Sequence, residues 1–171
     1  KPLGCYGDGG AIFTDDDHTA DLIRSLCVHG KGPGGKYDNV RVGMNSRLDA
    51  MQAAVLLPKL KALGDYEIDA RQQVVERYGR AFAGKLTTPF VAADTAQRDK
   101  IVAHLKEAGI PNMIYYPTPQ HALPVFRDEP HYGETFRNAD DYCARTFSLP
   151  MHPYLEQAEQ QQIIDAVLEA L

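Results

Sequence analysis

Residues that can act on a carbonyl group or an anionic substrate stand at several separate places in the sequence. Lys1 precedes a glycine-rich segment, Asn45 and Arg47 are separated by a single residue, and Tyr115 and Tyr116 stand directly before a proline. A lysine amine has a pKa of about 10.4, and it attacks carbonyl groups when burial or a neighbouring cation lowers that pKa. A guanidinium donates paired hydrogen bonds to a phosphate or a carboxylate. These residue types indicate carbonyl chemistry beside an anion site.

Each of these candidates also has a purely structural interpretation. Lys1 can be an ordinary charged terminal residue, Asn45 a helix-capping residue and Arg47 a surface cation. The rings of Tyr115 and Tyr116 can pack in a core. The sequence completes neither of the standard glycine-rich phosphate-loop motifs, and its six histidines show no ligand spacing, so it predicts no metal site.

The composition is that of a soluble globular protein, with 44% hydrophobic and 24% charged residues. A net charge of −5 disfavours nucleic acid or an anionic membrane as a partner. No apolar run reaches the roughly 18 residues of a membrane-spanning helix, and no signal-peptide pattern opens the chain. The three cysteines are an odd number without a CxxC pair, which is typical of reduced thiols in a cytoplasmic protein. Because the sequence opens on lysine inside a glycine-rich stretch, we expect it to be the back part of a longer polypeptide.

The first half of the sequence must position Lys1, Asn45 and Arg47. Glycines over 4–10 lead into an apolar run at 11–14, which predicts a turn and a buried strand. The next expected elements are a helix that is capped by aspartates 15–17 and runs to about residue 27, and a mobile loop or lid over 29–35. A helical block is expected over 46–83. It opens with a Ser46–Asp49 capping box, is kinked or interrupted by Pro58 and ends at Gly84 as a C′ residue.

The second half alternates between helices and short strands, so the fold is α/β or α+β. A connector over 86–94 marks the expected domain boundary. The expected elements are a helix over 97–108 closed by Gly109, a strand over 113–116, a helix over 138–146, a strand or turn over 147–150, and a helix over 159–171.

Four segments in order carry a more specific signal than any single residue. They are Lys1-Pro2-Leu3-Gly4-Cys5-Tyr6-Gly7-Asp8-Gly9-Gly10-Ala11-Ile12-Phe13-Thr14, the stretch over 42–54, the stretch over 110–117 and the stretch over 148–154. Together they resemble the DegT/DnrJ/EryC1/StrS family of sugar aminotransferases, which depend on pyridoxal phosphate. The sequence is most similar to members that aminate a UDP-linked 3-keto sugar acid during bacterial surface-polysaccharide (lipopolysaccharide) synthesis.

The resemblance implies the aspartate-aminotransferase-like fold, that is, an α/β pyridoxal-phosphate-dependent transferase of fold type I. Residues 1–45 would then be the end of the large cofactor-binding domain, residues 46–84 the connecting helices and residues 85–171 the small C-terminal domain. Family members work as homodimers with shared active sites, so we expect the same here. The chain lacks the other family residues that hold the cofactor, and we expect a polypeptide of residues 1–171 alone to bind pyridoxal phosphate poorly.

The resemblance also implies a role for each candidate residue. Lys1 would carry the cofactor as a Schiff base and move protons while glutamate donates its amino group to a nucleotide-linked keto sugar. Asn45 would reach the cofactor phosphate of the other subunit, and Arg47 would lie near the charged part of the substrate. Tyr115 and Tyr116 would lie near the nucleotide sugar, where relatives carry a His-Tyr pair.

Other functions remain open at this point. The chain could be a non-catalytic relative that binds a nucleotide sugar or serves as a dimer partner, or a pyridoxal-phosphate-dependent sugar dehydratase. Dehydratases of this family replace the cofactor lysine with histidine, so Lys1 favours amino transfer. Relatives carry a longer segment near residues 91–93, where this chain has only a short connector. His152 matches a recurrent family position and is interpreted as structural, and His29 as exposed or lining the mouth of the site.

Overall fold

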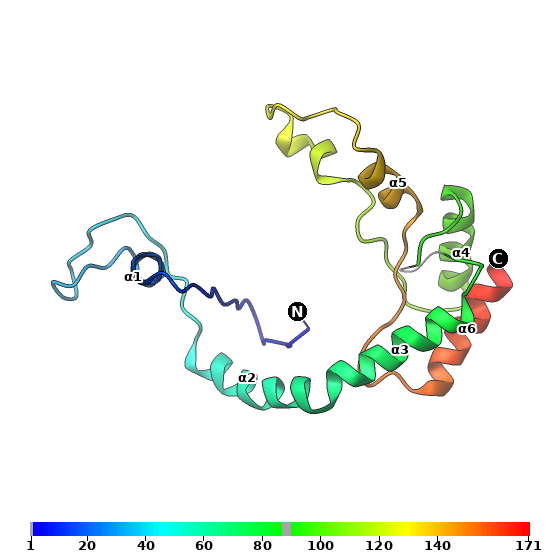
Figure 1. The fold of residues 1–171 in the computed structure, drawn as a ribbon, viewed down its shortest axis with the longest axis horizontal. Helices are drawn as coiled ribbons and strands as arrows, with labels where there is room; N and C mark the ends of the chain where they lie inside the picture. The colour runs from blue at the N-terminus through cyan, green and yellow to red at the C-terminus, as the bar shows by residue number, and fades with distance from the viewer. Residues whose placement is uncertain (1, 87–89) are drawn as a thin grey trace. The chain divides into compact units, whose positions relative to one another are not determined.

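The computed structural model describes residues 2–86 and 90–171, which form two compact units (Figure 1). The units divide between Asp65 and Tyr66. This division falls inside the stretch predicted to be connecting helices, and each unit is described by itself below.

The N-terminal unit begins with a glycine-rich segment and contains α1 (Asp17–Leu26) and α2 (Ala50–Ala62). Asp16 caps α1, because its side chain accepts a 3.0 Å hydrogen bond from the Thr19 amide. The predicted aspartate cap is therefore confirmed. No regular strand is present in the described residues, so the strand predicted at 11–14 is wrong for this structure. Ile12 and Phe13 lie largely in solvent instead of in a core.

The second helix starts later than the sequence predicts. Ser46 donates its backbone N–H to the Cys27 carbonyl at 3.0 Å, so residue 46 belongs to the preceding loop. Asp49 is the N-cap of α2 and makes no side-chain capping bond, so the expected capping box is absent here. α2 begins at Ala50, four residues after Ser46.

Pro58 does not interrupt α2, although it removes one helical donor. The irregularity comes five residues later, in the π-helix η1 (Leu63–Glu67), which leads directly into α3 (Ile68–Ala81). A π-turn widens the helix locally and often lies beside functional groups. Gly84 has the expected positive φ of +72°, but it follows the C-cap residue Phe82 by two positions, as C″ instead of C′.

The C-terminal unit contains α3 and three further helices, α4 (Thr95–Glu107), α5 (Arg137–Arg145) and α6 (Gln157–Ala170). These three confirm the helices expected in the second half of the sequence. It also contains the short 3₁₀ helices η2 (Gln120–Ala122) and η3 (Pro124–Phe126). Asp94 caps α4 by accepting a 2.8 Å bond from the Gln97 amide. Gly109, with φ +70°, ends α4 in a Schellman arrangement, since the next amide reaches the Leu105 carbonyl at 2.8 Å.

The strand predicted at 113–116 and the strand or turn predicted at 147–150 appear only as isolated bridges. Thr146 pairs with Val91, and Ser148 pairs with Met113, both in antiparallel sense. The segment over 146–148 therefore lies between two other extended segments and forms a minimal sheet. This pairing is too short to be a regular strand.

The core of the C-terminal unit lies between its helices and this minimal sheet. α4 packs against α6, as Figure 1 also shows. Tyr78 of α3 and the C-cap residue Phe82 stack with ring centroids 5.8 Å apart, and both are almost fully buried. The other buried core residues are Val74, Ile101, Leu105, Phe147, Leu149, Leu155, Ile163, Ile164, Ala166, Val167 and Ala170. Burial of these apolar side chains stabilises the fold of the C-terminal unit.

Candidate functional site

Asn45 and Arg47 lie together in the N-terminal unit. Arg47 donates from Nε to Oδ1 of Asn45 at 3.0 Å, and both side chains are exposed. They precede the first residue of α2 by five and three positions, so neither belongs to the first helical turn. The helix-capping interpretation of Asn45 is therefore wrong, and the α2 terminus is not what would attract an anion here.

The backbone around Asn45 is fixed by the end of α1. Asn45 forms an antiparallel bridge with Val28, and Met44 donates its N–H to the Leu26 carbonyl at 2.9 Å. Glycine is required at two positions where the chain passes close to itself. A Cβ on Gly43 would lie 2.2 Å from the Gly30 nitrogen, and a Cβ on Gly30 would lie 1.8 Å from the Arg41 carbonyl oxygen. These close approaches hold the segment that carries Asn45.

A cavity of about 570 Å³ joins Asn45 and Arg47 to the glycine-rich segment that follows Lys1. Its lining includes Gly9, Gly10 and Asp8. We call it the glycine-rich cavity. Its wall includes the Asn45 carboxamide and the Arg47 guanidinium, which can donate to a phosphate or carboxylate oxygen, and the Asp8 carboxylate, which repels one. Asn45 and Arg47 are therefore the two residues of this wall that fit the anionic part of a cofactor or substrate.

Gln52 holds the glycine-rich segment in place, and the sequence had not singled it out. Its amide nitrogen donates to the Tyr6 carbonyl, and its Oε1 accepts from Sγ of Cys5 at 3.2 Å. Both contacts join α2 to the segment that begins with Lys1. Lys1 itself lies outside the described residues.

Tyr115 and Tyr116 lie in the C-terminal unit and are not core residues. Their rings meet edge to face with centroids 5.7 Å apart, and they are 56% and 66% exposed. The core-packing alternative is therefore wrong for both tyrosines. The rings line a cavity of about 1120 Å³, together with η2 and one face of α5. We call this the aromatic cavity; its lining residues lie within 115–123 and 136–143.

A contact between a histidine and an aspartate, which the sequence did not predict, connects the two walls of the aromatic cavity. Nε2 of His121 lies 3.2 Å from Oδ1 of Asp140, and the His121 ring lies 4.6 Å from the Phe136 ring. His121 belongs to η2, whereas Asp140 belongs to α5. The contact therefore joins the two walls, and no sequence spacing signals it. His29 and His152 are exposed.

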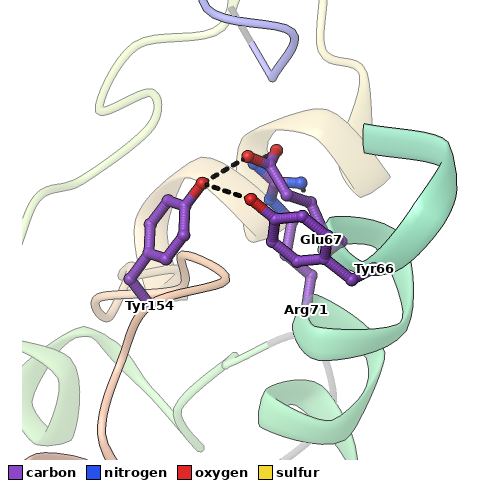
Figure 2. A network of polar contacts seen from close by, with 4 residues as sticks. All are labelled: Tyr66, Glu67, Arg71 and Tyr154. Atoms are coloured by element: carbon purple, nitrogen blue, oxygen red, sulfur yellow. Dashed lines mark hydrogen bonds and ion pairs between the residues drawn. The ribbon is translucent and has the colours of Figure 1, made fainter. Parts of the chain in front are cut away.

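A buried carboxylate lies near the start of α3. The side chain of Glu67 has no exposed surface, and the Tyr154 hydroxyl donates to its Oε1 at 2.6 Å (Figure 2). Arg71 lies 3.3 Å from the other carboxylate oxygen, and the Tyr66 hydroxyl lies 3.3 Å from that of Tyr154. The hydrogen bond to Glu67 raises the pKa of Tyr154 above that of an ordinary tyrosine. The network ties η1 to the segment that follows Pro150.

The cysteines Cys5, Cys27 and Cys143 are free thiols. Within 2–86 and 90–171, no group of three or more histidine, cysteine or acidic residues is arranged to hold a metal ion. None of the helices in these same ranges has the length and apolar character needed to cross a membrane.

The fold is that of a known class of enzymes. The chain superposes with a TM-score of 0.86 on the crystal structure of a DegT DnrJ EryC1 StrS aminotransferase from Brucella abortus, at 43% identity over 99% of this chain and 48% of that chain. The fold is therefore that of fold type I pyridoxal-phosphate-dependent transferases, which confirms the predicted fold class. Residues 1–168 match the DegT/DnrJ/EryC1/StrS aminotransferase family, and the chain belongs to this family.

Two curated relatives extend the comparison. The chain is 40% identical to UDP-2-acetamido-2-deoxy-3-oxo-D-glucuronate aminotransferase of Pseudomonas aeruginosa, over 98% of this chain and 48% of the relative. It is 35% identical to dTDP-3-amino-3,4,6-trideoxy-alpha-D-glucose transaminase of Streptomyces venezuelae, over 99% of this chain and 47% of the relative. The chain thus spans about half the length of the curated relatives it matches. The predicted resemblance to UDP-3-keto-sugar aminotransferases is confirmed.

Proposed function

We propose that this protein is a pyridoxal-phosphate-dependent aminotransferase that moves an amino group from glutamate to a nucleotide-linked keto sugar. Family membership over residues 1–168 supports the reaction type. The names of the two relatives, one UDP-linked and one dTDP-linked, support a pyrimidine nucleotide sugar as substrate. The proposed role is synthesis of amino sugars for bacterial surface polysaccharide, and the 30% identity of the chain to a spore coat polysaccharide biosynthesis protein supports it.

The observation that carries the proposal is the contact between Asn45 and Arg47 at 3.0 Å, because it sets a carboxamide and a guanidinium side by side, and both can donate to an anion. Asn45 donates its amide to the cofactor phosphate, and Arg47 holds the anionic part of the sugar nucleotide. When bound, pyridoxal phosphate would supply an electron sink and a carbonyl group that accepts the amino group. The Nζ amine of Lys1 would anchor the cofactor, take the proton from the glutamate carbon that carries the amino group, and later deliver a proton to the sugar carbon that receives this group.

The same proposal includes the architecture that the family implies. Residues 1–45 end the large domain, residues 46–84 form the connecting helices, and residues 85–171 form the small domain. Two copies assemble as a homodimer in the cytoplasm, and Asn45 serves the active site of the other subunit. Tyr115 and Tyr116 contact the nucleotide sugar from the small domain.

The proposal is tested on the complete native polypeptide. The protein is incubated with pyridoxal phosphate, reduced with borohydride and digested, and peptide mass spectrometry locates the pyridoxyl group. A pyridoxyl adduct on Lys1 is expected. An unmodified Lys1 in folded protein would remove the catalytic role and leave a nucleotide-sugar-binding relative.

Absorbance and product mass separate the remaining alternatives. Glutamate is expected to bleach the visible absorbance of the cofactor-bound protein, because it converts the cofactor to its amino form. Addition of a nucleotide-linked keto sugar is then expected to yield an amino sugar by mass. A product that has lost water without gaining nitrogen would identify a dehydratase and contradict the proposal.

A further inference from the structure

We propose that the aromatic cavity binds the pyrimidine base of the substrate nucleotide, with the base stacked on the rings of Tyr142 and Phe136. This inference rests on the proposed function, because it concerns the nucleotide part of the proposed substrate. It assigns a subsite to residues of η2 and α5 that extends well beyond Tyr115 and Tyr116.

The rings of the cavity present open apolar surface. Phe136 and Tyr142 are 43% and 40% exposed, and both line the cavity with Tyr115 and Tyr116. Aromatic rings that line a concave surface without packing in the core are a platform for a flat ligand. A nucleobase has a π-face of matching size, and stacking on protein rings is a general means of base recognition.

The residue types that line the cavity favour binding of the base over binding of the other parts of the nucleotide sugar. Its lining residues, all in the described part of the chain, include no lysine, arginine, aspartate or glutamate. A diphosphate needs cationic partners, so this part of the ligand is disfavoured here. The keto sugar must reach the reacting amine of Lys1. The neutral base is the part that gains most from a cavity whose lining is mainly aromatic and apolar and whose one basic side chain, His121, contacts Asp140.

Polar groups in the same wall match the edge of a pyrimidine. Gln120 and Asn138 line the cavity, and each carboxamide offers both a donor and an acceptor. Uracil and thymine share a 2,4-dione edge that alternates acceptor, donor and acceptor. The contact of His121 with Asp140 at 3.2 Å joins η2 to α5, so the two walls are held together before a ligand arrives.

The test uses the full-length protein loaded with pyridoxal phosphate and two probes, UDP and inorganic pyrophosphate, which lacks a base. Binding of each probe is measured by calorimetry for the native protein, for Tyr142→Ala and for Tyr132→Ala. Tyr132 is a matched control, since it is 43% exposed and lies outside the cavity lining. Loss of one stacking ring is expected to weaken UDP binding roughly tenfold. Pyrophosphate binding is expected to change less than twofold, as is UDP binding to Tyr132→Ala.

A second measurement needs no variant. Cys143 lines the aromatic cavity, whereas Cys5 does not. Bound UDP is expected to slow alkylation of Cys143 severalfold, with no effect of pyrophosphate on Cys143 or of UDP on Cys5. Equal UDP affinities for the two alanine variants, or unprotected Cys143 at saturating UDP, would overturn the subsite. Bleaching of the native protein by glutamate is scored separately, so failure of the subsite is distinguishable from failure of the proposed function.

Discussion

The Tyr154 hydroxyl lies 2.6 Å from a carboxylate oxygen of Glu67, whose side chain is fully buried. The second oxygen of this carboxylate faces Arg71 at 3.3 Å (Figure 2). A buried carboxylate is stable only when its oxygens have partners, because it has lost its hydration. The network therefore makes Glu67 a point at which η1, α3 and the segment before α6 are fixed together.

Replacement of Glu67 is expected to destabilise the fold far more than the same change at an exposed site. Glu67→Gln weakens the contacts to Arg71 and Tyr154 in a buried setting, and the expected loss in free energy of unfolding is about 1–3 kcal/mol. Glu76→Gln is the matched control, since Glu76 pairs with Arg80 on the same helix with both side chains exposed. Its expected effect is below about 0.5 kcal/mol. Urea unfolding measures both, and equal losses would contradict the role of the network.

Tyr78 is expected to make the stability fall at high pH. Burial raises the pKa of Tyr78 above its ordinary value, so the folded protein keeps a proton that the unfolded chain releases near pH 10. Stability from this residue is complete below about pH 10 and is lost as the pH rises toward the folded pKa. Unfolding in urea at pH 7 to 11 measures the slope.

The variant Tyr78→Phe provides the comparison for this pH dependence. It removes the 3.1 Å hydrogen bond to the Pro150 carbonyl and is expected to cost about 1 kcal/mol at pH 7. Because phenylalanine does not ionise, the difference between the two proteins is expected to shrink above pH 10. A difference that stays constant to pH 11 would show that Tyr78 ionises equally in both states.

Two glycine-to-alanine changes are expected to have opposite signs. Gly43→Ala places a methyl group 2.2 Å from the Gly30 nitrogen, so the loop must shift, at an expected cost of about 1–3 kcal/mol. Gly79 lies inside α3, and nothing lies within 4 Å of an added Cβ. Gly79→Ala is expected to stabilise by about 0.5–1 kcal/mol because alanine loses less entropy in a helix. Thermal unfolding of both variants gives the signs, and a stabilising Gly43→Ala would refute the close approach.

Arg47→Ala is expected to weaken use of the nucleotide sugar more than reaction with glutamate. Loss of a charge-assisted contact to the anionic substrate corresponds to a roughly ten- to hundredfold fall in kcat/KM for the sugar nucleotide. Arg24→Ala is the control, because Arg24 is exposed on α1 and pairs with Asp21. The two half-reactions are followed by cofactor absorbance and product mass. Equal losses in both half-reactions would mean that Arg47 holds the fold or the cofactor instead.

Local features of the structure were predictable because they depend on near neighbours in the chain. Asp16 and Asp94 cap helices through residues three positions later, and Gly109 ends α4 because glycine tolerates positive φ. The start of α2 was predicted too early, because the Ser46–Asp49 pattern does not show that residue 46 belongs to the loop after α1. The strand predicted at 11–14 does not form, because a strand needs a neighbouring strand to pair with, and a local apolar run cannot supply one.

The order of motifs along the chain by itself indicated the family, and the residue types of Lys1, Asn45 and Arg47 indicated the kind of chemistry that is proposed. Only the tertiary structure decided which side chains share a cavity. It separated Tyr115 and Tyr116 from the core, and it joined His121 to Asp140 across two elements. It also buried Glu67 against a tyrosine far away in sequence. Such contacts depend on how helices pack, and packing is set by the shape of the whole unit, which no local pattern of residues encodes.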